Sequence, residues 1–104
     1  MILKLKNLDR TFNISAPSEK TMSGVENKRY WVVSFKVLEH LTSDEVETFF
    51  TPENVSEMIC TTPLPNGTIY SYSINGYTNK ILGAIRHADD GSCVVDLQFA
   101  KEII

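Results

Sequence analysis

Three turn signals divide the second half of the chain into short segments. They are 63–67 (Pro-Leu-Pro-Asn-Gly), Asn75-Gly76 and Asp89-Asp90-Gly91. Asn-Gly and Asp-Gly pairs supply the positive φ that tight hairpin turns require. The segments between and after these signals have strand-like composition or alternate apolar with polar residues, and they are 68–74, 77–87 and 92–99. The pattern predicts a C-terminal antiparallel meander.

The clearest single strand is 29–38. Trp31, Val33, Phe35 and Val37 recur at every second position, so they share one face of an extended chain. We expect this face, with Trp31 in it, to form the centre of the core. The opposite face carries Tyr30 and Val32 as well as polar residues, which leaves room for a cover or a partner on that side. Near the N-terminus, the alternating segments 2–6 and 11–14 predict a first hairpin.

One strong helix signal follows the central strand. Thr42 can cap a helix while Glu45 reaches back to the cap, and the spacing of Val46, Phe49 and Phe50 presents them to a sheet. A short helix is therefore predicted at about 43–50. The next segment, 52–59, has two interpretations: a second short helix started by the proline, or a turn that feeds a strand from about residue 56 to residue 61. The β-branched residues near its end favour turn then strand.

A chain of 104 residues has room for one core, so residues 1–104 are expected to form a single domain. Residues 15–28 are rich in Ser, Gly, Pro, Lys and Glu with little apolar periodicity, and they are predicted to form a long flexible loop. The expected fold class is α+β and mainly antiparallel β. Its parts are the N-terminal hairpin, the central Trp-bearing strand, the one short helix and the C-terminal meander, forming a small sandwich or a partly open barrel.

Charge is distributed unevenly along the chain. The formal net charge is −3, but residues 1–36 hold seven basic and three acidic groups, whereas residues 37–57 hold six acids and no base. Such asymmetry suits head-to-tail packing of copies or docking on an oppositely charged partner. A solvated helix face with scattered surface lysines is the other interpretation. The candidate interaction surface comprises Glu39, Asp44, Glu45, Glu47, Glu53, Lys20, Lys28 and Arg29.

The residues that carry site chemistry form no recognised motif. His40, His87, Cys60 and Cys93 are too widely spaced for a zinc site, and the cysteines are expected to be buried thiols. Cys93 and His87 could approach across a hairpin, but nothing in the sequence supplies a lowered thiol pKa. No phosphate-binding glycine motif is present. We therefore expect no catalytic residue, no cofactor and no metal, and a protein that is not an enzyme.

Three tyrosines provide a weaker lead. Tyr70, Tyr72 and Tyr77 on neighbouring strands could form a stacking platform for single-stranded nucleic acid. Lys80 and Arg86 are the nearby basic residues in the sequence, whereas a groove that follows a nucleic-acid backbone needs several cations. Ordinary cross-strand packing is the alternative.

The opening segment lacks the features of a signal peptide, and no apolar run approaches the roughly 20 residues that span a bilayer. The chain is therefore expected to remain in the compartment where it is made and to have no membrane partner.

The order of segments resembles a known group. The strand Tyr30-Trp31-Val32-Val33-Ser34-Phe35 is followed by 41–54 (LTSDEVETFFTPEN), then by Gly76-Tyr77-Thr78 and by a closing strand, 94–97 (VVDL). Across residues 28–101 this order is similar to small proteins encoded in the tail modules of siphophages and prophages of Gram-positive bacteria. The N-terminal third departs from the pattern.

The resemblance implies a tail-associated structural or assembly protein that acts through protein–protein contacts. Its partners would be other phage tail proteins or copies of itself in a homo-oligomer. It would be located in the bacterial cytoplasm during assembly and then in the virion. No catalytic residue is carried over. The alternatives are a small phage-encoded regulator or inhibitor that binds a host or phage protein, and a single-stranded nucleic-acid-binding module.

Overall fold

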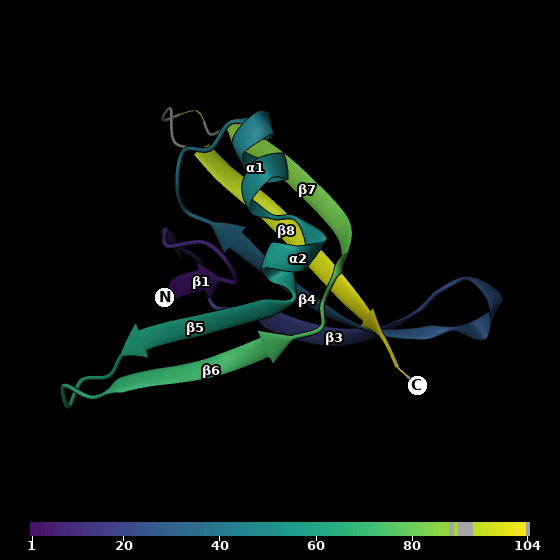
Figure 1. Cartoon of the computed structure of the whole chain (residues 1–104), viewed down its shortest axis with the longest axis horizontal. Coiled ribbons are helices and arrows are strands. Elements are labelled where there is room, and N and C mark those ends of the chain that lie inside the picture. Colours follow the sequence, from purple (N-terminus) through teal and green to yellow (C-terminus); the bar gives the residue numbers. More distant parts are fainter. Residues whose placement is uncertain (88, 90–92, 104) are drawn as a thin grey trace.

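The computed structural model describes residues 1–87, 89 and 93–103, and in these ranges the chain forms two four-stranded antiparallel sheets and two short helices (Figure 1). The strands are β1 (Ile2–Leu5), β2 (Thr11–Asn13), β3 (Ser18–Ser23), β4 (Arg29–Val37), β5 (Glu57–Pro63), β6 (Ile69–Asn75), β7 (Asn79–His87) and β8 (Cys93–Glu102). The helices are α1 (Ser43–Phe49) and α2 (Pro52–Val55), and a 3-10 turn, η1 (Val25–Asn27), precedes β4. The mainly antiparallel β class with a little helix is confirmed, and the sheets are not closed into a barrel.

The chain passes between the two sheets three times, after β2, after β4 and after β6, in ways that local patterns do not show. The first sheet, here sheet A, has the order β2-β1-β5-β6, and the second, sheet B, has the order β3-β4-β8-β7. The predicted N-terminal hairpin is therefore confirmed as β1–β2. The predicted C-terminal meander is wrong as a continuous unit, because β5–β6 belongs to sheet A and β7–β8 to sheet B. The switch follows Gly76, whose φ of +85° reverses the chain after β6.

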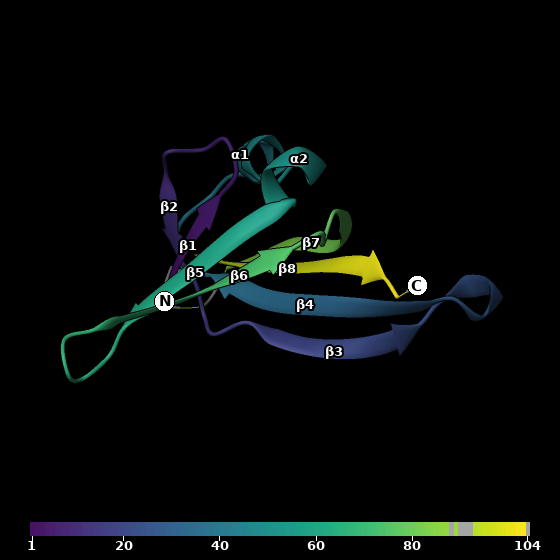
Figure 2. The same ribbon diagram turned by 60° about the horizontal axis from the view of Figure 1, so that its bottom comes forward.

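One hydrophobic core joins the two sheets and the helices. It contains residues from sheet A such as Leu3 and Phe12, and residues from sheet B such as Phe35 and Phe99. Phe50, which follows α1, links the two groups, since its ring centroid lies 5.2 Å from that of Phe12 and 6.4 Å from that of Phe99. Sheet A and the helices thus lie over the same face of sheet B, the inner face (Figure 2).

The helix prediction at 43–50 is confirmed, and so is its cap. The Thr42 hydroxyl accepts from the backbone N–H of Glu45 at 3.2 Å, and the Glu45 carboxylate accepts from the backbone N–H of Thr42 at 3.1 Å. In 52–59 the favoured turn is wrong for the first half, where α2 forms because Thr51 caps Asn54 and Pro52 occupies the first turn. The predicted strand in the second half is confirmed as β5.

Trp31 is not at the centre of the core. Its side chain is 42% exposed, whereas Val33, Phe35 and Val37 on the same face are buried. The reason is partial coverage: Trp31 lines a hollow with Ser73 and Asn75 at the end of β6, so sheet A does not close over it. Val32, on the opposite face, is fully buried.

The predicted flexible loop at 15–28 is wrong, because it contains β3 and η1. Six residues of β3 pair antiparallel with β4, from Ser18 opposite Ser34 to Ser23 opposite Arg29. Every β3 residue is exposed, so no apolar alternation marks the strand.

Two hairpins project from opposite ends of the molecule (Figure 1). The charged ribbon is residues 18–31, comprising β3, η1 and the start of β4. The uncharged ribbon is residues 58–75, most of the β5–β6 hairpin, and it contains no Asp, Glu, Lys or Arg. Gly67 turns its tip with a φ of +87°, in agreement with the turn signal at 63–67. The third turn signal, Asp89-Asp90-Gly91, lies mostly outside the described residues.

Candidate interaction surfaces

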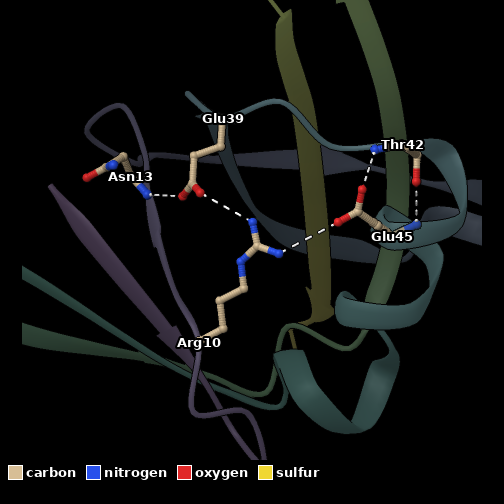
Figure 3. A network of polar contacts seen from close by, with 5 residues as sticks. All are labelled: Arg10, Asn13, Glu39, Thr42 and Glu45. Atoms are coloured by element: carbon tan, nitrogen blue, oxygen red, sulfur yellow. Dashed lines mark hydrogen bonds and ion pairs between the residues drawn. The ribbon is translucent and has the colours of Figure 1, made fainter.

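Two of the acidic candidates meet a basic side chain from the connection between β1 and β2. Arg10 lies between the two, with 3.4 Å from its Nη2 to Glu39 Oε1 and 3.7 Å from its Nη1 to Glu45 Oε2 (Figure 3). The second Glu39 oxygen accepts from the backbone N–H of Asn13 at 2.7 Å. Arg10 also lies 5.1 Å from the ring centroids of Phe12 and Phe49. Glu39 and Glu45 therefore tie the α1 end of the molecule to the β1–β2 hairpin.

Glu45 is held ionised by this arrangement. The hydrogen bond from the Thr42 backbone lowers the pKa of the Glu45 carboxyl, and the nearby Arg10 charge acts in the same direction. Its principal role is to cap α1.

The other acidic candidates are divided between internal contacts and solvent. Glu47 Oε1 lies 2.7 Å from Lys80 Nζ on β7, and Glu53 Oε1 accepts from Asn7 Nδ2 at 3.1 Å. Asp44 is exposed in the first turn of α1. Four of the five acidic candidates thus have contacts within the chain, which the charge count alone could not show.

The basic candidates lie on the charged ribbon. Lys20 is exposed on β3 opposite Val32, Lys28 follows η1, and Arg29 begins β4. Glu19 and Glu26 lie on the same ribbon, so its charge is mixed. Figure 1 shows that this ribbon and α1 occupy different parts of the molecule. The structure therefore separates the basic candidates from the acidic ones.

Two of the hollows on the outer face of sheet B differ in character. The polar hollow, of about 420 Å³, includes Ser34, Lys36, Gln98 and an ion pair in which Arg86 Nε lies 2.6 Å from Asp96 Oδ2. The apolar hollow, of about 490 Å³, is lined by Met22, Tyr30, Ile81 and Ala100, with Glu26 and Lys28 also in its lining. The sequence signal for this face was the pair Tyr30 and Val32 on the far side of the central strand. The Arg86–Asp96 pair was missed, because the meander prediction made 77–87 and 92–99 neighbouring strands but did not give the register between them.

The tyrosine candidates separate into a pair and a core residue. Tyr70 and Tyr72 lie on one face of β6 with ring centroids 5.8 Å apart. Tyr77 is buried after β6, with Lys101 Nζ 4.7 Å from its ring centroid. Partial burial beside Cys60 raises the pKa of Tyr72 to about 12, and burial also raises the pKa of Tyr77. The structure brings two of the three rings together.

Both cysteines are buried free thiols. Burial raises the pKa of Cys60, which makes its thiolate less accessible at neutral pH. Cys93 is opposite His87 in the β7–β8 register, and the His87 ring centroid lies 6.5 Å from that of His40. Among the described residues, no three His, Cys, Asp or Glu side chains are grouped so that they could hold a metal ion.

Neither helix in the described ranges combines the length and the apolar character needed to cross a bilayer. The chain matches no protein-family model. No significant match was found among curated proteins or among solved structures.

Proposed function

We propose that this chain is a tail-associated structural or assembly protein of a siphophage or prophage of Gram-positive bacteria, and that it acts through protein–protein contacts. Two lines support the proposal: the segment order across residues 28–101, and the projection of two hairpins beyond the core at opposite ends of the molecule (Figure 1). The second observation carries it. Projecting hairpins with exposed side chains reach neighbouring subunits without disturbing the core that holds them.

The charged ribbon is the surface proposed for heterologous tail partners. Five charged residues lie on it, including Lys20, Lys28 and Arg29, and the described atoms include no ion pair for these three. Exposed charges of this kind steer encounter and select partners, since they lose little by remaining in water until a complementary surface arrives. The protein would be present in the bacterial cytoplasm during assembly and then in the virion.

The test is co-expression of a tagged chain with the products of neighbouring tail genes, followed by affinity capture. We expect at least one tail protein to co-purify. The triple variant Lys20→Glu, Lys28→Glu and Arg29→Glu should lose that protein, whereas Lys4→Glu with Lys6→Glu, exposed on or beside β1, should keep it. Failure of every tail-gene product to bind contradicts the proposal, and capture of a host protein instead would favour a regulator or inhibitor.

The nucleic-acid alternative has less support from the geometry. Tyr70 and Tyr72 form a tilted pair, with 42° between their ring planes, and the uncharged ribbon provides no cation beside them. Lys80 and Arg86 are engaged with Glu47 and Asp96. A strand-tracking groove needs several free cations along its length.

A further inference from the structure

The four edge strands of the two sheets differ in how they are protected against pairing with another chain. An edge strand presents unpaired backbone groups, and proteins guard such edges with charges, bulges, short strands or a covering segment. The edges here are β2 and β6 in sheet A, and β3 and β7 in sheet B.

Three of these edges are guarded. β3 carries Glu19 and Lys20. β7 carries Lys80 and Arg86, and its register with β8 shifts between Lys80 and Leu82. β2 has three residues, and the chain just beyond it is joined to β4 by the bridge between Ile14 and Val37.

The edge of β6 has none of these protections. Its seven residues, Ile-Tyr-Ser-Tyr-Ser-Ile-Asn, include no charge, no proline and no glycine, and their register with β5 is unbroken. Ile69 is 73% exposed and Tyr70 is 53% exposed. Such a strand is a ready template for another strand, and selection ordinarily removes it from a monomer.

The open part of the β6 edge is 69–73. At its far end Lys101 Nζ donates to the carbonyl oxygen of Asn75 at 3.2 Å, and Ile74 is buried in the core. Most of the open stretch lies on the projecting ribbon (Figure 1), and only Ser73, at its core end, shares a hollow with Glu19 and Trp31 of sheet B.

We infer that β6 pairs antiparallel with β6 of a second copy of this chain, about a two-fold axis at Ser71, to form a closed dimer. A strand that pairs with β6 must have a free edge of its own. It must also be uncharged, because β6 has no charged side chain that could neutralise a charge on its partner. In the described part of the chain β6 itself meets both conditions over more than three residues. A two-fold at Ser71, the midpoint of the open stretch, places Tyr70 of one copy opposite Tyr72 of the other.

This inference rests on the proposed function, since it assigns the assembly role a self-complementary surface. The two divide the work between the ribbons: the uncharged ribbon joins copies, and the charged ribbon remains available for other tail proteins. Because β6 is consumed once per copy, the pairing closes at two subunits and does not propagate into a filament.

The test measures the oligomeric state by sedimentation velocity over a concentration series. Wild type should be dimeric at high concentration. Ser71→Lys places two like charges opposite each other and should weaken dimerisation by roughly tenfold. The matched control, Thr21→Lys on the guarded edge of β3, should not change it. Circular dichroism checks that both variants fold, which we expect because both positions are exposed.

A charge-pairing arm tests the two-fold itself. Ser71→Glu alone should be as monomeric as Ser71→Lys, but an equimolar mixture of the two variants should form a heterodimer. A wild-type chain that remains monomeric at about 1 mM overturns the inference, as do open-ended oligomers or a Ser71→Lys variant that dimerises like wild type.

The two proposals fail separately. A wild-type chain that is monomeric but captures a tail protein refutes the β6 pairing alone. A dimer that captures no tail protein refutes the assembly role alone.

Discussion

The two projecting ribbons are both two-stranded hairpins, but they differ in how they are anchored to the rest of the protein and in how their free edges are protected. The uncharged ribbon is rooted in the core through Met58, Cys60 and Ile74, which are almost fully buried. The outer strand of the charged ribbon, β3, buries no side chain and is held by its backbone pairing with β4. Core packing therefore fixes one ribbon, and main-chain hydrogen bonds fix the other.

The comparison shows that the way a strand is anchored limits which side chains can protect its free edge. A strand whose residues are all exposed can carry charges on both faces, and those charges also protect its edge. A strand that alternates into a core must keep its inner face apolar, and β6 is uncharged on its outer face as well. The uncharged ribbon is consequently both the more firmly held and the less protected of the two.

Removing the root of the uncharged ribbon should have the largest effect on stability. Met58→Ala empties a fully buried site between the sheets, and we expect the free energy of unfolding to fall by about 2–5 kcal/mol in chemical denaturation. Ile59→Ala, the next residue on the opposite face, should cost less than about 1 kcal/mol because its side chain is 43% exposed. Equal losses at the two positions would show that the ribbon is not anchored through its inner face.

The largest side chain of the charged ribbon should matter less than its size suggests. Trp31→Ala should lower the free energy of unfolding by about 1–2 kcal/mol, because only part of the indole leaves water on folding. The measurement is again chemical denaturation. Trp31 is also the chain's single tryptophan, so the native emission should lie between that of a buried indole and that of a fully solvated one. A loss of about 3–5 kcal/mol, typical of a fully buried tryptophan, would contradict the open inner face.

The tip of the uncharged ribbon depends on one glycine. Gly67 has a φ of +87°, so Gly67→Ala should destabilise the protein by about 1 kcal/mol through backbone strain alone, since no atom lies within 4 Å of the added Cβ. Gly67→Asn, which tolerates left-handed backbone, should recover most of the loss in the same thermal or chemical unfolding assay. If Gly67→Asn costs as much as Gly67→Ala, strain at this turn is not the cause.

The smallest expected effect is on stability at alkaline pH. It comes from Tyr72, which lies on β6 in the uncharged ribbon and is partly buried. Folding raises the pKa of Tyr72 from about 10 to about 12, so the unfolded chain ionises first as the pH rises. The Tyr72 contribution to stability is complete below about pH 10 and is lost progressively as the pH approaches 12. In near-ultraviolet absorbance titration, Tyr72→Phe should remove one late-ionising tyrosine. Tyr70→Phe should leave that late step unchanged.

Local signals in the sequence predicted local structure correctly. The Thr42 and Glu45 pair forms the expected cap, and the turn at Gly67 has the expected left-handed backbone. The alternation of Val33, Phe35 and Val37 gave the buried face of the central strand. In each case the residues that determine the structure lie within a few positions of one another.

The errors arose where distant segments decide the outcome. Alternation placed Trp31 on the inner face but could not show where sheet A stops covering that face. β3 was missed because an edge strand exposed on both sides has no apolar period. The division of the C-terminal strands between two sheets depends on which earlier strands they pair with, and no short window of sequence contains that information.

The candidate interaction surface was also predicted only in part, because its ion pairs join segments that are distant in the sequence. Charge counting found the acidic segment, yet Glu39 and Glu45 share Arg10, which lies on the connection between β1 and β2. Ion pairs of this kind depend on tertiary proximity. A count by segment can find charged residues but cannot distinguish a surface open to partners from one closed by internal contacts.

The pairing of β4 with β8 also determines the order in which the strands of sheet B can pair while the chain is being synthesised. Tyr30 near the start of β4 lies opposite Glu102 near the end of β8, so the central ladder of sheet B joins distant parts of the chain. On the ribosome, β3 and β4 can form a hairpin early, but β8, which follows the other three strands of sheet B in the chain, enters the middle of the sheet and not its edge. Folding dominated by such non-local pairing is intrinsically slow. Until β8 arrives, β4 and β7 present open edges in a partly made chain, and unpaired edges of this kind favour misassembly during that interval.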